Sequence, residues 1–172
     1  MIKTTTTVNT ILVDVDIKTH FKKIFSFFNM NLSLDGRKFF PRKIKWDEIP
    51  EIFQDVNFIY RTLEVQNNYQ KHIDFLKKQN MTALDNIKTI VPNNTITIIP
   101  NDFPYNTEKN VLHYVVWCRN VVPTKQEIVS EIEKFALHND FEDFIFFQNP
   151  PSLQSIPELL HYHLFLKTFE NF

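Results

Sequence analysis

The chain has 172 residues, and its 19 lysine and arginine side chains nearly balance its 20 aspartate and glutamate side chains. This length predicts one domain with a sizeable core, and the net charge of -1 argues against an extended nucleic-acid-binding surface. The single glycine excludes the glycine-rich phosphate loops of P-loop and Rossmann proteins, and we expect no cofactor.

The first ten residues, MIKTTTTVNT, do not have the basic start and apolar segment of a signal peptide. No apolar run approaches the roughly 20 residues that span a membrane. Cys118 is the one cysteine of the sequence, so no internal disulfide can form, and its apolar surroundings predict a buried, unreactive thiol. These features predict a soluble cytoplasmic protein that does not associate with membranes.

The first half of the sequence predicts helices. Residues 1–10 are expected to fray, and residues 11–172 to form one domain whose helical part covers about 15–92. The stretch Asn31–Lys45 contains glycine and proline and predicts a linker or a long surface loop. The expected elements are an edge strand at Ile11–Val15 and helices at Ile17–Phe28, Trp46–Gln54, Phe58–Val65, Gln66–Gln79 and Thr82–Ile90.

The second half, at about 93–168, predicts a sheet. Thr124 and Glu127 have the spacing of a capping box and therefore predict the start of a helix between strands. Because the connections are short, we expect an α+β fold with an antiparallel sheet of about four to five strands, preceded by and packed against the helices. The expected elements are strands at Thr95–Ile99, Val111–Cys118, Phe144–Phe147 and Leu159–Leu166 and a helix at Thr124–Leu137.

Three histidines are expected to share one face of this sheet. His161 and His163 are two residues apart, and the side chains of a strand repeat every two residues. We expect Val111–Cys118 and Leu159–Leu166 to be neighbouring antiparallel strands, with His113 on the same face as the other two histidines.

The same alternation predicts what surrounds the histidines. Trp117 and Phe165 would form the floor of a cleft, with the histidines toward its mouth and the loops Asn101–Asn106 and Asn149–Ser155 as its rim. The opposite face of the two strands is expected to pack under the helix Thr124–Leu137. That face carries Tyr114, Val116, Tyr162, Leu164 and Leu166.

The histidine pair has several interpretations that the sequence leaves open. Imidazole titrates near neutral pH, so His161 and His163 can bind a phosphate, transfer a proton or attack phosphorus. The plainer interpretation is a strand whose polar face carries hydrogen-bonded histidines. A further alternative is a metal site that these two histidines form with His113 and Asp102.

Three more residues have both a structural and a functional interpretation. Asp102 either forms an Asx turn or orients a histidine. Tyr105 either packs in the core or stacks on a base or sugar. Arg61 is the one cation of the apolar stretch NFIYRTL, and it is either a surface residue or a partner for Asp102 or for a ligand phosphate.

Two C-terminal blocks have a recognisable pattern. They consist of Asn101-Asp102-Phe103-Pro104-Tyr105 with His113-Tyr114-Val115-Val116-Trp117, and of Asn149-Pro150, Ser155-Ile156-Pro157 and His161-Tyr162-His163. With Trp46, Arg61 and Tyr69 upstream, the sequence resembles the fungal N-acetylglucosamine-induced protein family, an uncharacterised domain, over about residues 45–167. The resemblance implies a fold but no reaction, and Asn106 departs from it at a position where we expect glycine.

The C-terminal stretch is also similar, more distantly, to the histidine-triad (HIT-like) superfamily, in which a polar loop precedes alternating histidines on a last strand. The resemblance implies that Asn149, Gln154 and Ser155 help to hold phosphates and that a histidine attacks phosphorus. One of the three histidines is missing here. If the triad begins at His161, then His163 is the nucleophile, whereas His161 is the nucleophile if the triad ends at His163.

Two functions follow as hypotheses. The first is a nucleotide- or phosphate-ligand-binding protein, with hydrolase or transferase activity through His163 or His161. Its expected ligand-binding residues are His113, Asp102, Tyr105, Arg61, Asn149, Gln154 and Ser155. The second is a non-catalytic protein–protein interaction module with a degenerate pocket, which the missing histidine and the many phenylalanines favour.

Overall fold

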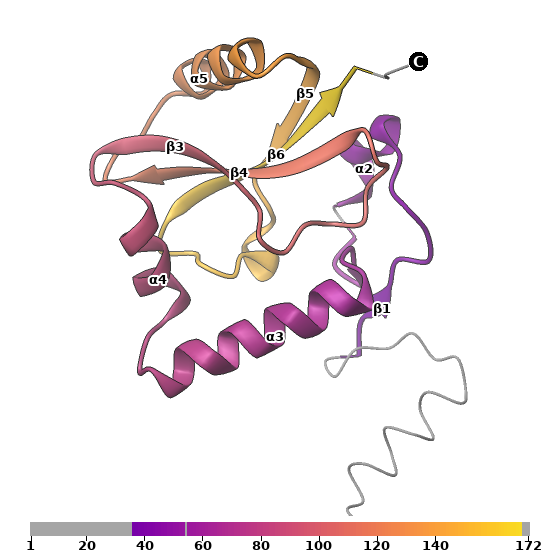
Figure 1. Ribbon diagram of the computed structural model, residues 1–172, viewed down its shortest axis with the longest axis vertical. Coiled ribbons are helices and arrows are strands. Elements are labelled where there is room, and N and C mark those ends of the chain that lie inside the picture. Colours follow the sequence, from indigo (N-terminus) through magenta and orange to yellow (C-terminus); the bar gives the residue numbers. More distant parts are fainter. Residues whose placement is uncertain (1–35, 54, 170–172) are drawn as a thin grey trace, which may run out of the picture. The chain divides into compact units, whose positions relative to one another are not determined.

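The computed structural model describes residues 36–53 and 55–169, and all of them lie in the second of the chain's two units, Leu32–Phe172 (Figure 1). The expected strand at Ile11–Val15 and the expected helix at Ile17–Phe28 lie outside the described residues.

A four-stranded antiparallel sheet is the centre of the described chain, which confirms the α+β prediction. The strand order is β3-β4-β6-β5. The inner strands are β4 (Val111–Arg119) and β6 (Leu160–Thr168), and they pair antiparallel as expected. The outer strands are β3 (Thr95–Pro100) and β5 (Phe141–Phe147).

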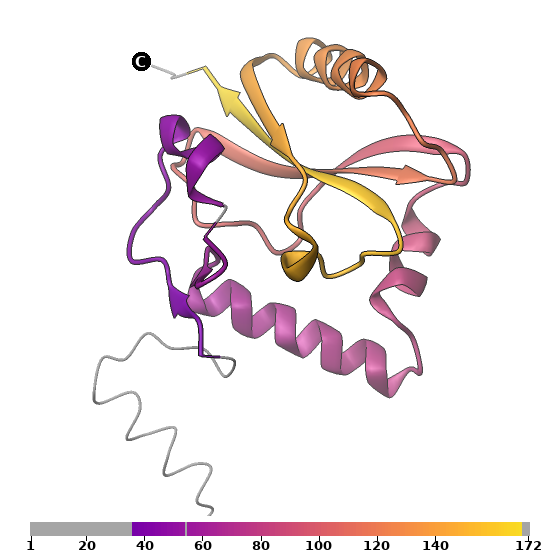
Figure 2. The ribbon, with the colours of Figure 1, turned by 180° about the vertical axis from the view of Figure 1, so that it is seen from behind.

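Helix α5 (Lys125–His138) covers one face of the sheet (Figures 1 and 2). Its N-terminus has the predicted capping box: the Thr124 hydroxyl accepts a hydrogen bond from the Glu127 N–H, and the Glu127 carboxylate accepts one from the Thr124 N–H. The expected packing of this strand face under the helix is confirmed. The buried cluster consists of Val116, Ile128, Ile132, Ala136, Leu164 and Leu166, with Tyr114 and Tyr162 partly buried beside it.

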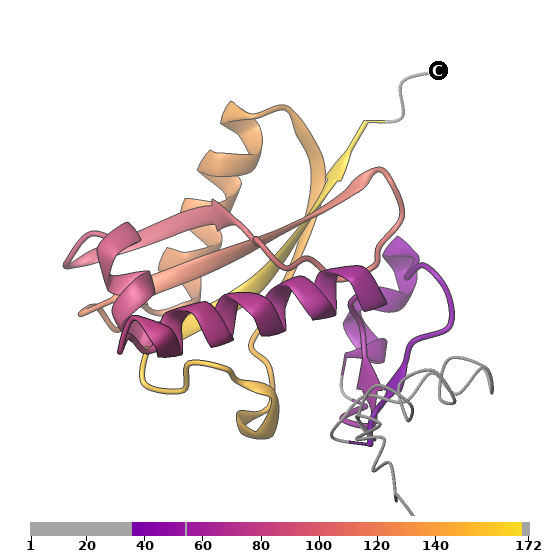
Figure 3. The same cartoon turned by 60° about the horizontal axis from the view of Figure 1, so that its bottom comes forward.

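The opposite side of the sheet faces α3 (Leu63–Lys78), α4 (Ala83–Ile90) and the loop that precedes β6 (Figure 3). Thr82 and Asp85 form the predicted capping box of α4. No helix within the described ranges is both long and apolar enough to cross a membrane. The buried residues on this side include Val91, Val115, Trp117, Ile156 and Leu159.

The segment Asn31–Lys45 was predicted to be a linker or a long surface loop, but part of it pairs with other segments of the domain. Strand β1 (Lys38–Phe39) pairs in parallel with β2 (Phe58–Ile59). Ile44 is completely buried and bridges to Thr107, in the loop before β4.

The predicted helix at Phe58–Val65 is wrong in its first half. Its first two residues form β2, and α3 begins at Leu63 behind the N-cap Thr62, whose hydroxyl accepts from the Val65 N–H. By contrast, the short helix expected at Trp46–Gln54 is confirmed as a 3-10 turn, η1 (Trp46–Glu48), followed by α2 (Ile49–Ile52).

The thiol of Cys118 should be nearly unreactive in the folded protein. Cys118 is 2% exposed, and burial raises the pKa of its thiol to about 11. Because the thiolate is the nucleophile, we expect alkylation by a maleimide near neutral pH to be roughly a hundredfold slower than for a free thiol. Mass spectrometry after timed labelling measures the rate, with the denatured chain as control. Equal rates in the folded and denatured chain would contradict the prediction.

Candidate functional site

The three histidines converge on the sheet face that lies opposite α5, as predicted from their spacing. Because side chains alternate along a strand, all three point to this side. They are well buried, with exposed fractions of 4–7%. In the register of β4 and β6, the facing pairs are His113 with Phe165, Val115 with His163, and Trp117 with His161.

His113 and His163 are joined by a direct hydrogen bond in which Nε2 of His113 lies 2.9 Å from Nδ1 of His163. The backbone N–H of Tyr105 donates to Nδ1 of His113 at 3.0 Å. The Tyr105 ring also stacks on the His163 ring, with centroids 5.3 Å apart and an interplanar angle of 18°. The two imidazoles therefore fasten the loop before β4 to both inner strands.

Asn101 supports the same loop from its first residue. Its Oδ1 accepts from the backbone N–H of Phe103 at 2.9 Å, which is an Asx turn, and its Nδ2 lies 3.3 Å from His113 Nε2. The turn role that we predicted for Asp102 therefore belongs to its neighbour.

Asn149 closes the other end of the histidine pair. The side chain is 5% exposed, and its Nδ2 lies 2.8 Å from His163 Nε2 and 3.2 Å from the Tyr105 hydroxyl oxygen. Its Oδ1 is buried without a hydrogen-bond partner among the described residues. The Gln154 side-chain amide donates to the backbone carbonyl of Asn149 at 2.7 Å and so holds this loop in place.

His161 has a different environment from the other two histidines. Its Nδ1 lies 2.7 Å from the carbonyl oxygen of Leu159. A carbonyl oxygen only accepts hydrogen bonds, so Nδ1 carries the ring proton and Nε2 has the lone pair. Within the described part of the chain, that Nε2 has no hydrogen-bond partner. The ring lies 4.8 Å from Trp117 and 6.2 Å from His163, measured between centroids.

Arg61 lies beside the histidine pair, between β2 and α3, and is half-buried. Its Nε–H donates to the Phe103 carbonyl at 2.9 Å, and its Nη1 donates to Gln66 Oε1 at 3.3 Å. Its Cζ lies 4.7 Å from the centroid of the Tyr69 ring and 5.6 Å from that of Tyr105. Among the described residues, no carboxylate forms an ion pair with this guanidinium, and its Nη2 has no hydrogen-bond partner.

Burial sets the charge of the cluster. It lowers the pKa of His163 to about 3, with smaller contributions from His161 and Arg61, and it holds the pKa of His113 well below 6.5, with contributions from His163 and Arg61. Burial also lowers the pKa of His161, and the hydrogen bond to the Leu159 carbonyl offsets only part of this effect. At pH 7 the three imidazoles are therefore neutral. Burial lowers the pKa of Arg61 as well, but from 12.5, so the guanidinium brings a positive charge next to uncharged rings.

The expected cleft is wrong in two respects. The histidines do not stand at an open mouth, because little of their surface is exposed. Trp117 and Phe165 do not form a common floor, because they lie at opposite ends of the histidine row. Phe165 stacks on His113 at 4.3 Å between centroids, whereas Trp117 contacts His161.

Asp102 and Ser155 are not brought to the cluster. Both are exposed, and neither makes a hydrogen bond to a histidine. Residues 36–53 and 55–169 contain no group of three histidine, cysteine, aspartate or glutamate residues that could hold a metal ion. The structure therefore joins His113, His161, His163, Tyr105, Arg61, Asn149 and Gln154, and leaves the two exposed residues out.

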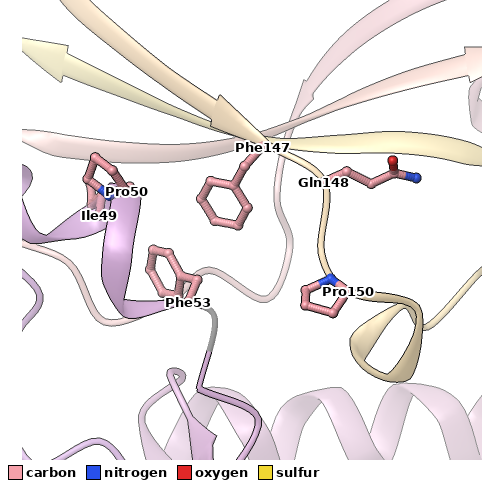
Figure 4. A pocket seen from close by; sticks show the side chains of 6 residues that line it. All are labelled: Ile49, Pro50, Phe53, Phe147, Gln148 and Pro150. Atoms are coloured by element: carbon pink, nitrogen blue, oxygen red, sulfur yellow. The ribbon is translucent and has the colours of Figure 1, made fainter.

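A pocket of about 440 Å³ is lined in part by Phe147 (Figure 4). Phe147 stacks on His163 with ring centroids 5.8 Å apart, and Figure 4 shows its ring and that of Phe53 facing the same hollow. The lining is mostly apolar. It consists of Ile49, Pro50, Phe53, Phe147, Gln148 and Pro150.

Sequence reasoning missed three residues of this region. Asn101 had a usable signal, because an asparagine directly after a strand with an aromatic residue two positions later fits an Asx turn. Phe53 and Phe147 had none. The chain has 18 phenylalanines, and their spacing does not indicate which of them meet.

A family model with the description "Protein of unknown function (DUF3605)" matches residues 45–167. Among curated proteins, N-acetylglucosamine-induced protein 1 of Candida albicans is 31% identical over 93 residues, which cover 45% of this chain and 37% of that protein. The chain therefore matches less than half the length of this curated relative. Among solved structures, the crystal structure of HTC1 is similar over 73% of this chain and 85% of that chain, with 22% identity and a TM-score of 0.43.

Proposed function

We propose that this chain, which belongs to the DUF3605 family of proteins of unknown function, binds a nucleotide or another phosphorylated small molecule beside its histidine cluster. The resemblance to N-acetylglucosamine-induced proteins is supported by the 93-residue similarity to one of them, and the family model matches residues 45–167. The class of ligand and the more distant similarity to the histidine-triad superfamily are both proposals.

The observation that carries the proposal is the environment of Arg61. A half-buried guanidinium is usually neutralised by a carboxylate, but here its neighbours are a carbonyl, an amide and two aromatic rings. These contacts fix the plane of the guanidinium and leave Nη2 without a partner among the described residues. A preoriented guanidinium of this kind suits a phosphate, because it donates two parallel hydrogen bonds. The rings of Tyr69 and Tyr105 offer stacking surfaces for a base or sugar next to that phosphate.

If the protein is an enzyme, we assign the reacting lone pair to His161, which is 4% exposed in this structure, so the attack requires that the ring be uncovered when the ligand binds. Its Nδ1–H is held by the Leu159 carbonyl, and its Nε2 lone pair is free of hydrogen bonds within the described chain. In the proposed step, an Nε2–P bond forms while the P–O bond to the leaving group breaks. The leaving oxygen keeps the electron pair and takes a proton from water, and a second water then hydrolyses the phosphohistidine. The Leu159 carbonyl stabilises the positive imidazole ring of that intermediate.

A thermal-shift screen with mononucleotides, dinucleoside polyphosphates and sugar nucleotides tests the binding. We expect at least one ligand to stabilise the wild type. The shift should disappear in Arg61→Met and persist in Lys71→Met, which removes an exposed charge from α3. Arg61→Lys keeps the charge but loses the planar donor pair, so its affinity should fall roughly 10- to 100-fold. No stabilising ligand, or an equal shift in Arg61→Met, would reject the proposal.

The alternative function is a non-catalytic interaction module, and the apolar pocket that Phe147 lines favours it. In that case the pocket takes an aliphatic or aromatic side chain of a partner peptide. Selection from a peptide library should then yield binders of the wild type that do not bind Pro50→Arg, because this change puts a charge on the pocket wall. Failure to select such peptides would count against the module.

A further inference from the structure

The hydrogen-bond partners of His113 determine where its proton lies. Its Nδ1 accepts from the backbone N–H of Tyr105, which can only donate. A neutral imidazole has one protonated nitrogen, so the proton of His113 must be on Nε2. The nearest acceptor is Nδ1 of His163 at 2.9 Å. The Nδ2 of Asn101, at 3.3 Å, is a donor whose orientation is fixed by the bond from Phe103 to Asn101 Oδ1, and it cannot take this proton.

The same reasoning continues through His163. Its Nδ1 accepts from His113, so its own proton must be on Nε2, which faces the carboxamide of Asn149 at 2.8 Å. Two donors cannot share that contact, and Asn149 must therefore present its oxygen. The two ends of a carboxamide have nearly the same shape, so a half-turn about the Cβ–Cγ axis of Asn149 changes no packing. The turn gives the carboxamide oxygen its partners and moves the nitrogen to the buried position that has no partner among the described residues, so the direction of the chain is decided by the ring protons and not by this count.

We propose that Tyr105, His113, His163 and Asn149 form a hydrogen-bond chain with a single direction, which runs from the Tyr105 N–H to the Asn149 side-chain oxygen. After the turn, the Tyr105 hydroxyl donates to the same oxygen, so Tyr105 is held at both its backbone and its ring. Every ring nitrogen of His113 and His163 is then engaged. These two histidines are positioning residues that hold the Tyr105 ring under Arg61, and neither has a lone pair available for attack.

His161 differs from the other two histidines. The hydrogen-bond chain therefore favours the register in which the triad ends at His163 and His161 is the nucleophile. It has the opposite tautomer, with the proton on Nδ1 and a free lone pair on Nε2. The assignment of His161 as the reactive histidine rests on the proposed function, whereas the tautomers of the three rings do not depend on any ligand.

Long-range 1H–15N correlation spectra of the uniformly labelled full chain at pH 7 test the inference. We expect His113 and His163 to show the Nε2–H tautomer and His161 the Nδ1–H tautomer, with assignments from single substitutions. The unliganded protein is used, so a failed ligand screen would reject the proposed function and leave this result untouched. An Nδ1–H tautomer at His113 or His163 would contradict the proposed direction of the hydrogen-bond chain.

Two replacements of Asn149 test its role as an acceptor. Asn149→Asp has the same shape and keeps an oxygen toward His163, so the Nε2–H signal of His163 should persist. Asn149→Leu removes the acceptor, and the exchange of that proton with water should accelerate by about tenfold or more. If Asn149 were a donor, the Asp variant would shift His163 to its other tautomer, which would overturn the proposal. If either variant does not fold, the wild-type spectrum still decides between the two directions.

Discussion

Acidification from pH 7 to pH 5 is expected to lower the free energy of unfolding steeply. Burial depresses the pKa of His163 to about 3 and that of His113 well below 6.5. At pH 7 both histidines are neutral in the folded state and mostly neutral in the unfolded chain. Below this pH the unfolded chain takes up protons that the folded chain cannot, so stability is lost as the pH falls from 6.5 toward 3. Each excluded proton costs about 1.4 kcal/mol per pH unit, so His163 alone costs roughly 2 kcal/mol by pH 5, and His113 adds to this loss in the same direction.

The hydrogen-bond chain gives a second reason for this sensitivity, because an added proton on Nδ1 of His163 would face the N–H of His113. Between pH 7 and pH 5, the change in the free energy of unfolding reports on the histidines and not on the carboxylates. The capping carboxylates Asp85 and Glu127 have lowered pKa values and contribute only at more acidic pH. Denaturant unfolding at several pH values measures the slope, and His163→Phe should remove part of it. Constant stability between pH 7 and pH 5 would contradict the predicted burial of neutral histidines.

Phe165→Ala should be among the most destabilising single substitutions in the sheet. Phe165 is completely buried and stacks on three rings: His113 at 4.3 Å, Phe53 at 5.3 Å and Phe147 at 5.8 Å between centroids. Truncation of a buried phenylalanine typically costs roughly 3–5 kcal/mol, because burial is lost and a cavity remains. The loss is large here because β6 joins the histidine row to the aromatic cluster around α2.

Denaturant unfolding at pH 7 measures this cost. Leu112→Ala serves as the matched control, because Leu112 lies on the neighbouring strand and is 39% exposed. We expect its cost to be clearly smaller than that of Phe165→Ala. Phe165→Leu should fall between the two and keeps the comparison possible if the alanine variant does not fold. Equal costs for Phe165→Ala and Leu112→Ala would show that the ring stack does not stabilise the sheet.

Local sequence patterns predicted the second half of the fold well. The alternation of His113, Val115 and Trp117 fixed which face of β4 carries polar rings, and the capping box at Thr124 located α5. Both signals are short in range, because a strand's period and a helix cap depend on neighbouring residues only. They can therefore be recognised in the sequence without knowledge of tertiary contacts.

The segment around β1 and β2 could not be predicted in this way. Each of these strands has two residues, which is too short for any periodic signal. The burial of Ile44 results from a bridge to Thr107, and that contact spans more than sixty positions. Long-range pairing of this kind leaves no local trace in one sequence.

The sequence predicted which residues gather at the candidate site better than it predicted their burial and their protonation. Spacing brought the three histidines to one face, but it did not indicate that they are buried or which nitrogen carries each proton. The positions of the protons follow from the Tyr105 N–H and the Leu159 carbonyl, which are backbone groups with no sequence signature. The turn was predicted at Asp102, whereas in the structure the side-chain oxygen of its neighbour Asn101 accepts the turn hydrogen bond from the Phe103 N–H.

The most direct test of the central claim, that Arg61 is an anion-binding group, is a titration of the full chain with inorganic pyrophosphate at pH 7. Side-chain 1H–15N spectra report each arginine separately. The Nε–H signal of Arg61 should shift and saturate, together with signals of Tyr105. Arg42, whose guanidinium is already paired with Glu48 at 2.6 Å, should not respond. An unchanged Arg61 signal, or equal shifts of Arg61 and Arg42 that do not saturate, would contradict the claim.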